Sequence, residues 1–296
     1  MTTSLIRALH TRHDPLPLLH DPWGDRLVPA SGVEFIHQKA LLSLSAQALA
    51  RPATLSMSPG DSWLHSRPFY TGVITRSRFA EDALLAAVKR GVRQYVLLGA
   101  GFDSFSLRRP DGVRDLVVYE IDHPATQAVK RQRMAVCQVT PRAPVHYIAA
   151  NLSKEGVAAA LLRSDFRFNE PVFFSWLGVT MYLSRTDNLG LLGAIGQLAA
   201  PGSEVVFNYF DQEAFFDNTG SGPFSEMQRS VTAIGEPLLS GFDPAHLAKD
   251  LHGIGLSLQE DLDDAQTLQR YDRLGANGLQ PLGWSHVARA SVPVRN

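Results

Sequence analysis

Two glycines separated by one residue follow directly on a short apolar run, and this is the clearest chemical signal in the chain. Residues 94–98 read Gln-Tyr-Val-Leu-Leu and continue into Gly99-Ala100-Gly101. Such a run is typical of a buried strand, and glycine lets the loop after it turn tightly and lie against a ligand. We therefore expect a ligand-binding loop at residues 99–103.

A second apolar run, residues 116–122, ends in two acids. Glu120 lies 19 residues after Gly101 (120 − 101), and Asp122 lies 21 after it (122 − 101). In doubly wound α/β folds an acid about 20 residues beyond the glycines binds the ribose hydroxyls. Residues two apart in a strand share a face, so spacing leaves the choice between these acids open. The pattern predicts a site for a nucleoside-containing cofactor.

The loop differs from a dinucleotide-binding loop at its end. The third small residue of Gly-x-Gly-x-x-Gly/Ala is missing, because Ser104 stands in its place. Asp103 precedes it, and negative charge there is unfavourable for a pyrophosphate. An acid suits the cationic S-adenosylmethionine, which we expect, with NAD as the alternative. Asp103 can also cap the following helix, and the two roles are compatible.

Residues 97–108 resemble the signature of leucine carboxyl methyltransferase-like S-adenosylmethionine-dependent methyltransferases, which include a bacterial branch of polyketide-type O-methyltransferases. Further segments resemble the family in the same order: residues 20–23, 75–79, 119–124, 176–183, 201–203 and 235–237. The resemblance spans nearly the whole chain. It implies a class I methyltransferase that uses S-adenosyl-L-methionine.

The resemblance also implies roles for single residues. Arg76 matches the arginine that binds the methionine carboxylate, a pairing that suits the geometry of a guanidinium. Arg78 is its nearest competitor, and Arg7 is a further candidate. The family pattern favours Asp122 over Glu120 for the ribose.

Two positions depart from the family pattern. Asn151, followed by Leu152, stands where an acid usually accepts from the adenine amino group; an amide oxygen can accept the same bond, or Asn151 can cap a helix. Leu177 replaces the usual glutamate that contacts the cofactor's amino group. Backbone carbonyls around Gly99 and Trp176 are expected to substitute for it. This change keeps a non-catalytic S-adenosylmethionine-binding protein as an alternative.

The expected site has no assigned catalytic residue and no metal ligand. His65 is a candidate base, with a partly exposed structural histidine as the competing interpretation, and Tyr182 is expected either to line the pocket or to pack in the core. Asp261, Asp263 and Asp264 lack the pattern of a calcium loop and are expected on a solvated face. The expected cofactor-binding residues are Arg76, Gly99, Ala100, Gly101, Asp103, Glu120, Asp122, Asn151, Leu152 and Trp176.

Composition limits the other function classes. The chain has 296 residues and a net charge of −1, which offers no basic field for a nucleic-acid backbone. No run approaches the ~18 apolar residues of a membrane span, and the N-terminus does not resemble a signal peptide. Cys137 is the one cysteine and has no disulfide partner in the chain. We expect a cytoplasmic protein without nucleic-acid or membrane partners; the oligomeric state stays open.

The alternation of strands and helices predicts a Rossmann-like doubly wound sheet, mostly parallel with an antiparallel C-terminal strand. Strands are expected at 95–98, 116–121, 145–149, 171–176, 204–209, 255–259 and 284–290. Helices are expected at 34–49, 79–90, 124–136, 153–162, 185–198 and 224–234. One domain is expected over 1–296, divided into an N-terminal helical region (1–90), a cofactor-binding core (91–210), a substrate cap (211–248) and C-terminal strands (249–296).

The expected cap is rich in apolar side chains, at Phe215, Phe216, Phe224, Met227 and Ile234. An apolar lid favours a small, largely apolar methyl acceptor over a peptide or a nucleic acid. We therefore expect O-methylation of a phenolic hydroxyl or a carboxylate on a small metabolite.

Overall fold

The computed structural model describes residues 1–47, 57–113, 115–216, 222–233 and 235–294. Within these residues seven strands form one sheet in the order β3-β2-β1-β4-β5-β7-β6. Strands β1 to β5 pair in parallel, and β7 pairs antiparallel with both β5 and β6. The predicted sheet is thereby confirmed. The strands are β1 (Gln94–Leu98), β2 (Val117–Asp122), β3 (Val145–Ala149), β4 (Val172–Trp176), β5 (Glu204–Phe210), β6 (Ser257–Asp263) and β7 (Ser285–Ser291).

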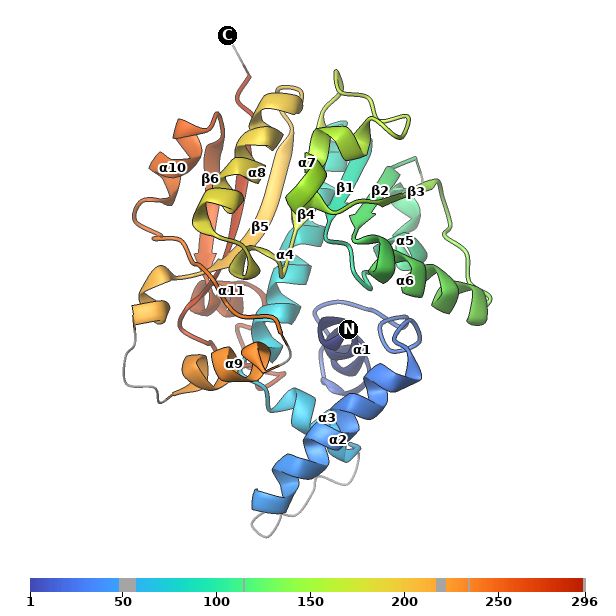
Figure 1. The fold of residues 1–296 in the computed structure, drawn as a ribbon, viewed down its shortest axis with the longest axis vertical. Helices are drawn as coiled ribbons and strands as arrows, with labels where there is room; N and C mark the ends of the chain where they lie inside the picture. Colours follow the sequence, from blue (N-terminus) through green and yellow to red (C-terminus); the bar gives the residue numbers. More distant parts are fainter. Residues whose placement is uncertain (48–56, 114, 217–221, 234, 295–296) are drawn as a thin grey trace.

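Helices cover both faces of the sheet (Figure 1). The apolar side of α4 (Tyr70–Lys89) packs on one face with α5 (Phe105–Arg108), while α7 (Leu152–Leu161), α8 (Arg185–Leu198) and α10 (Leu247–Gly253) pack on the other. Alternate residues of β1 divide between the two layers, since Tyr95 and Leu97 face α4 whereas Val96 and Leu98 face α7 and α8. Alternate side chains of a strand point to opposite faces of the sheet, and because helices cover both faces, both sets are buried.

The remaining elements surround the carboxyl ends of the parallel strands. Figure 1 shows the N-terminal helices at this end of the sheet, beside the cap helix α9. The Ser4 and Arg7 side chains of α1 both donate hydrogen bonds to the Phe102 carbonyl in the loop after β1, at 3.0 Å each, and fix this arrangement. These elements are α1 (Thr2–His13), α2 (Ala30–Gln47), α3 (Pro59–His65), η2 (Thr180–Tyr182), η3 (Gln212–Phe216) and α9 (Pro223–Thr232). Three further elements are η1 (Asp111–Val113), which lies beside the amino ends of β1 and β2, α6 (Pro124–Val136), which follows β2, and α11 (Asp264–Tyr271), which follows β6.

Helix α4 spans Tyr70–Lys89 and so begins nine residues before the predicted start at residue 79. Its first half packs on α1, through Val73 and Ile74, whereas its second half packs on the sheet. Because the two halves of α4 pack in different apolar clusters, the helix has no single apolar face along its length. Its first turns therefore could not be recognised from the apolar spacing of the sequence. The predicted end is confirmed, because Gly91 follows the helix with φ +106°.

Most other predicted elements are confirmed with small shifts at their ends. Strand β6 is an exception, because it spans residues 257–263 instead of 255–259. Helix α2 ends at Gln47, and the predicted extension to residues 48 and 49 lies outside the described residues. Helix α9 ends at Thr232, and Ile234 likewise lies outside them.

The prediction of a solvated face for the three C-terminal acids is wrong. Asp264 is 3% exposed and accepts hydrogen bonds from the backbone N–H groups of Leu282 and Ser285, each 3.2 Å long. Burial raises its pKa to about 6. Asp261 accepts a bond from the Tyr209 hydroxyl, and Asp263 caps α11. The three acids hold β6 and α11 in place.

Two broader properties concern the described part of the chain. It contains no helix that is long and apolar enough to cross a membrane. In the same residues we find no group of three or more His, Cys, Asp or Glu side chains that could hold a metal ion.

Helix α8 provides a test of its packing on the C-terminal strands. A Cβ at Gly196 would stand 2.8 Å from the Ile254 carbonyl oxygen, whereas one at Gly190 would meet no atom within 4 Å. Gly190→Ala should raise the free energy of unfolding by up to about 1 kcal/mol, the helix propensity difference. Gly196→Ala should lower it, because the clash outweighs that gain. Urea unfolding measures both, and equal stabilisation by the two variants would contradict the packing.

Candidate active site

The glycine loop lies against the end of β2. The backbone N–H of Gly99 donates to the Ile121 carbonyl at 2.9 Å, and the N–H of Gly101 donates to the Asp122 carboxylate. Both glycines have positive φ, +67° and +52°, which a residue with a Cβ adopts only at a cost. A Cβ at Gly99 would also stand 2.8 Å from Val179 Cγ2. The loop therefore needs glycine for its conformation and for its closeness to residues 178–179.

The two competing acids of β2 have different surroundings. Glu120 is 1% exposed and bonds with the Lys130 ammonium and, at 3.0 Å, with the Ser106 hydroxyl. Burial raises the pKa of Glu120, against the opposing effect of Lys130. Asp122 is at the strand end, partly exposed, and accepts from the N–H groups of Gly101 and His123. Two of its roughly four acceptor positions remain for a ligand, whereas Glu120 is enclosed by protein.

The other acids and amides of the predicted site begin helices. The N-cap of α5 is Ser104 and not Asp103, but Asp103 accepts a hydrogen bond of 2.7 Å from the backbone N–H of Phe105, the first residue of that helix. Asn151 immediately precedes α7, and its backbone N–H donates to Glu155 at 2.9 Å. Leu152 packs against the core beside it. Ala100 is buried in the loop.

Arg76 and Arg78, both on α4, are separated by their partners. Arg78 donates to the Leu18 carbonyl at 2.7 Å and to Asp82 at 3.0 Å. The Arg76 guanidinium lies 2.8 Å from where a Cβ at Gly178 would stand, and no described residue hydrogen-bonds or ion-pairs with it. Burial lowers the pKa of Arg76 to about 10, which leaves it charged at neutral pH. Arg76 is half-buried, and a cation partly removed from water without a hydrogen-bond or ion-pair partner is costly, which points to an anionic ligand.

A buried ionic network beneath the glycine loop was missed at the sequence level. Arg7 donates to Asp21 at 2.9 Å and to the Phe102 carbonyl at 3.0 Å. Arg108 lies 3.9 Å from the other oxygen of Asp21 and pairs with Glu81. Burial opposes ionisation of Asp21, but Arg7 and Arg108 outweigh it and lower its pKa. Arg7 thus holds the loop in place, and the only sequence signal for this was the resemblance of residues 20–23.

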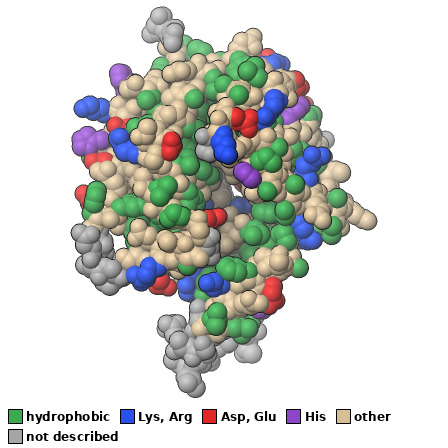
Figure 2. Space-filling model, viewed as in Figure 1, with side chains coloured by type: hydrophobic (Ala, Val, Ile, Leu, Met, Phe, Trp, Pro, Cys, Tyr) green, Lys and Arg blue, Asp and Glu red, His purple; other side chains and the backbone are tan. Residues whose placement is uncertain are grey.

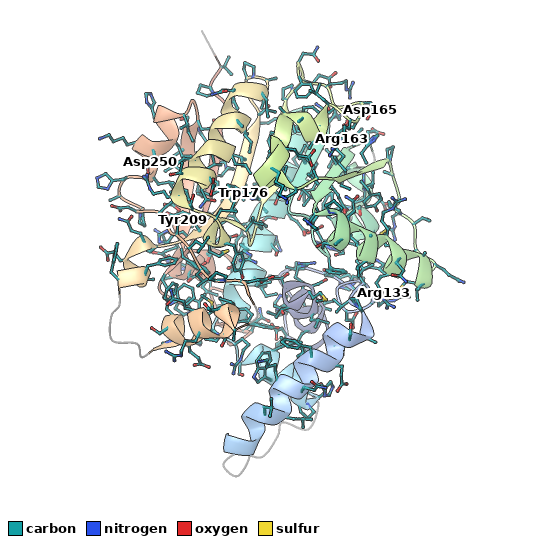
Figure 3. All side chains as sticks on the ribbon, in the orientation of Figure 1. Arg133, Arg163, Asp165, Trp176, Tyr209 and Asp250 are labelled. Carbon is teal, nitrogen blue, oxygen red and sulfur yellow. The ribbon has the colours of Figure 1, made fainter. Side chains whose placement is uncertain are left out.

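The end of β4 contributes backbone to the site and little side chain. Trp176 is 1% exposed and packs with Tyr209 among core residues on the α8 side of the sheet (Figure 3). Its indole is therefore core, and only its backbone is at the strand end. Gly178, with φ +74°, donates its N–H to the Asn208 side chain at 2.6 Å. Leu177 packs into the core on the α4 side of the sheet.

A cavity of about 580 Å³ opens beside this region. Figure 2 shows a hollow near the middle of this face, between the sheet and the N-terminal helices. Arg76, Gly178, Tyr182 and Glu236 line the cavity, and its other walls are mainly apolar. The apolar residues of the lining include Phe69, Val73, Met181, Phe210, Met227 and Leu238.

The cap residues divide into two groups. Phe224 is 6% exposed and packs edge-on against Phe210 and Trp284, at ring distances of 6.0 and 4.9 Å. Phe215 packs on Phe224, whereas Phe216 is exposed. Met227 reaches the cavity. Most cap aromatics therefore attach the cap to the core, and the wall toward the cavity comes from its aliphatic side chains.

His65 lies away from this cavity. Its Nε2 is 3.2 Å from Asp14 Oδ1, and its ring packs on Tyr70 at 4.6 Å. The hydrogen bond to Asp14 raises the pKa of His65. Asp14 also accepts from His10 and Tyr70, so this cluster joins α1, α3 and α4. The structure supports the structural interpretation of His65.

The sequence of this chain is similar to those of known proteins. A family model described as leucine carboxyl methyltransferase matches residues 1–196. A Bacillus subtilis protein named "Putative S-adenosyl-L-methionine-dependent methyltransferase YktD" is 29% identical over 93% of each chain. A Mycolicibacterium gilvum protein named "Putative S-adenosyl-L-methionine-dependent methyltransferase" is 32% identical over 73% of this chain and 67% of its own.

Solved structures share the fold. The crystal structure titled as a putative methyltransferase from Thermobifida fusca YX superposes with a TM-score of 0.57. The superposition covers 90% of this chain and 99% of that one, at 17% sequence identity. The crystal structure titled as a DUF574 family protein from Streptomyces avermitilis superposes with a TM-score of 0.56 at 16% identity, over 81% of this chain and 94% of its own.

The buried pair of Glu120 and Lys130 yields a stability prediction. Lys130→Met leaves a carboxylate in the core without its cation, which should lower the free energy of unfolding by about 3–5 kcal/mol. Adding Glu120→Gln should recover most of that loss, because the buried charge is gone. Urea unfolding of both variants tests this, and a loss below ~1 kcal/mol for Lys130→Met alone would show that the pair is not enclosed as described.

Proposed function

The chain belongs to the leucine carboxyl methyltransferase family and is an S-adenosylmethionine-dependent methyltransferase, and we propose that it O-methylates a small, largely apolar metabolite of the polyketide type. The acceptor group is a phenolic hydroxyl or a carboxylate. One observation carries the proposal: Arg76, a charged arginine without a hydrogen-bond or ion-pair partner among the described residues, lines an apolar cavity and lies beside Gly178, the neighbour of the Val179 that faces Gly99.

The residues around the loop fit this cofactor. We propose that Arg76 binds the methionine carboxylate, because its guanidinium lies beside Gly178, has no hydrogen-bond or ion-pair partner among the described residues, and matches a carboxylate in geometry. Asp122 holds the ribose with the acceptor positions that Gly101 and His123 leave unused. Asn151 and Leu152 are proposed on the adenine side. Asp103 keeps one carboxylate oxygen for the amino group while the other accepts from Phe105.

Two of the expected contacts receive narrower roles in the proposal. Glu120 is enclosed by Lys130 and Ser106, so it supports β2 rather than the ribose. Trp176 contributes only its backbone, because its side chain is buried in the core. The Leu177 position offers no carboxylate, and backbone carbonyls at this strand end substitute for it.

The bound cofactor supplies a methyl group activated by a sulfonium. The protein's part is orientation and exclusion of water, since an in-line displacement needs the two reacting atoms close and aligned. Apolar walls from Phe69, Met181 and Met227 hold an apolar acceptor body against the cofactor side of the cavity. We propose residues 211–248 as the substrate cap of a single domain.

The proposal also covers partners and location. A net charge of −1 offers no field for a nucleic acid, so the acceptor is a small molecule. We propose that the enzyme acts in the cytoplasm. The side chains near the cavity provide no metal chemistry in this proposal, so methyl transfer should proceed in the presence of a chelator.

The carboxylate clamp is tested by comparing two neighbouring arginines. Arg76→Ala should weaken S-adenosylhomocysteine binding by about 1.5–3 kcal/mol, the range for a hydrogen bond to a charged group. It should leave adenosine binding nearly unchanged, because adenosine has no carboxylate. Arg78→Ala is the matched control and should alter neither. Calorimetry measures all four affinities, and equal losses of both ligands in Arg76→Ala would assign Arg76 a structural role.

The acceptor class is tested by turnover with a chelator present. Hydroxy-aromatics, fatty and keto acids, and peptides ending in leucine are each incubated with labelled S-adenosylmethionine. We expect methylation within the first two groups. Activity confined to the peptides, or lost on chelation, would overturn the proposed acceptor class.

A further inference from the structure

Three polar side chains converge on the apolar cavity without protein partners. Arg76, Tyr182 and Glu236 all line it, and no described residue hydrogen-bonds with any of these three side chains. A few convergent polar groups in an otherwise apolar cavity are what orient a bound ligand. If the proposed function holds, Arg76 faces the cofactor, and Tyr182 and Glu236 are left to face the methyl acceptor.

The loop that carries Glu236 is fixed to the turn that carries Tyr182. The backbone N–H of Leu239 donates to the Met181 carbonyl at 2.8 Å, and the Ser240 hydroxyl donates to the Leu183 carbonyl at 2.7 Å. Leu238 and Met181 are both buried in the same apolar cluster. Glu236 itself follows Gly235, which has φ +82°, and its N–H donates to the Val231 carbonyl at 3.0 Å. Glu236 is an exposed residue that lines the cavity, and these bonds fix the residues on both sides of it.

Charge separates the roles of the three groups. With Arg76 bound to the methionine carboxylate, its charge is matched by the cofactor. Burial and the nearby Arg7 lower the pKa of the Met1 α-ammonium, which also lines the cavity, so the main charge left facing the acceptor is the negative one of Glu236. A second carboxylate brought into the cavity would meet a like charge, and interfaces reject ligands by that means. A hydroxyl brings no charge and carries a proton that a carboxylate can accept.

We propose that Glu236 is the catalytic base for a hydroxyl acceptor and that Tyr182 orients the acceptor oxygen, so that hydroxyl compounds and not carboxylic acids are the substrates. The acceptor oxygen forms its bond to the methyl carbon as the carbon–sulfur bond breaks. The electron pair of that bond stays on sulfur, which becomes a neutral thioether. The hydroxyl proton passes to the Glu236 carboxylate and leaves to water when the product departs.

The test compares acceptors that do and do not need a base. One probe is 2-naphthol, which is neutral at pH 8. The other is a nitro-substituted naphthol that is already ionised at that pH. A third probe, 2-naphthoic acid, keeps the apolar body and replaces the hydroxyl by a carboxylate. The variants are Glu236→Gln and, as a matched control from the exposed surface of the same cap, Glu213→Gln.

For wild type we expect turnover of 2-naphthol and at least tenfold less of 2-naphthoic acid. Glu236→Gln should lower kcat for 2-naphthol by about 100-fold or more, the lower range for a general base. It should change kcat for the ionised naphthol by less than about threefold, since that acceptor has no proton to give up. Calorimetry with S-adenosylhomocysteine should give both variants wild-type affinity, and Glu213→Gln should match wild type throughout.

Each contrary result has a separate meaning. Equal losses with the neutral and the ionised naphthol would make Glu236 structural, and unchanged turnover would remove its role; either overturns the inference. Wild-type turnover confined to carboxylic acids would overturn it while leaving the proposed O-methylation standing. Failure of every hydroxyl and carboxyl acceptor in the broader screen would instead overturn the proposed function itself.

Discussion

The hydrogen bond from the Gly101 N–H to the Asp122 carboxylate joins the two segments on which the site depends. It holds the loop after β1 over the end of β2, where the proposed site would bring the cofactor against both. The loop reaches this position because Gly99 and Gly101 adopt positive φ and because residue 99 has no Cβ to meet Val179. From the other side, Arg7 and Ser4 donate to the Phe102 carbonyl, so α1 supports the same loop. The N-terminal helices are thus part of the site's framework.

Asp21 explains how that support is maintained in a buried setting. Its carboxylate is fully buried, yet it lies between Arg7 and Arg108, which also pairs with Glu81. Each charge therefore has an opposite charge nearby, which offsets the cost of removing it from water. Arg76, on α4, has no ion-pair or hydrogen-bond partner among the described residues. The contrast between these arginines is the main physical reason to assign the methionine carboxylate to Arg76.

The strands of the sheet and the class of cofactor could be predicted from the sequence because both depend on short, local patterns. Five apolar runs and the Gly99-Ala100-Gly101 loop with Asp122 are short-range features, and the structure has the strands where they were expected. The start of α4 was missed because its first half packs on α1 and its second half on the sheet. The choices between Arg76 and Arg78, and between Glu120 and Asp122, needed partners distant in sequence, such as Leu18 and Lys130. The burial of Asp264 was missed for the same reason, since residues 282 and 285 provide its donors.

The central claim is that this loop holds S-adenosylmethionine and not a dinucleotide. Calorimetric titration of the wild-type protein with S-adenosylhomocysteine and, separately, with NADH tests it most directly. The account predicts saturable heat with S-adenosylhomocysteine and none with NADH, because Asp103 and Ser104 occupy the turn that a pyrophosphate would need. Saturable binding of NADH without binding of S-adenosylhomocysteine would contradict it.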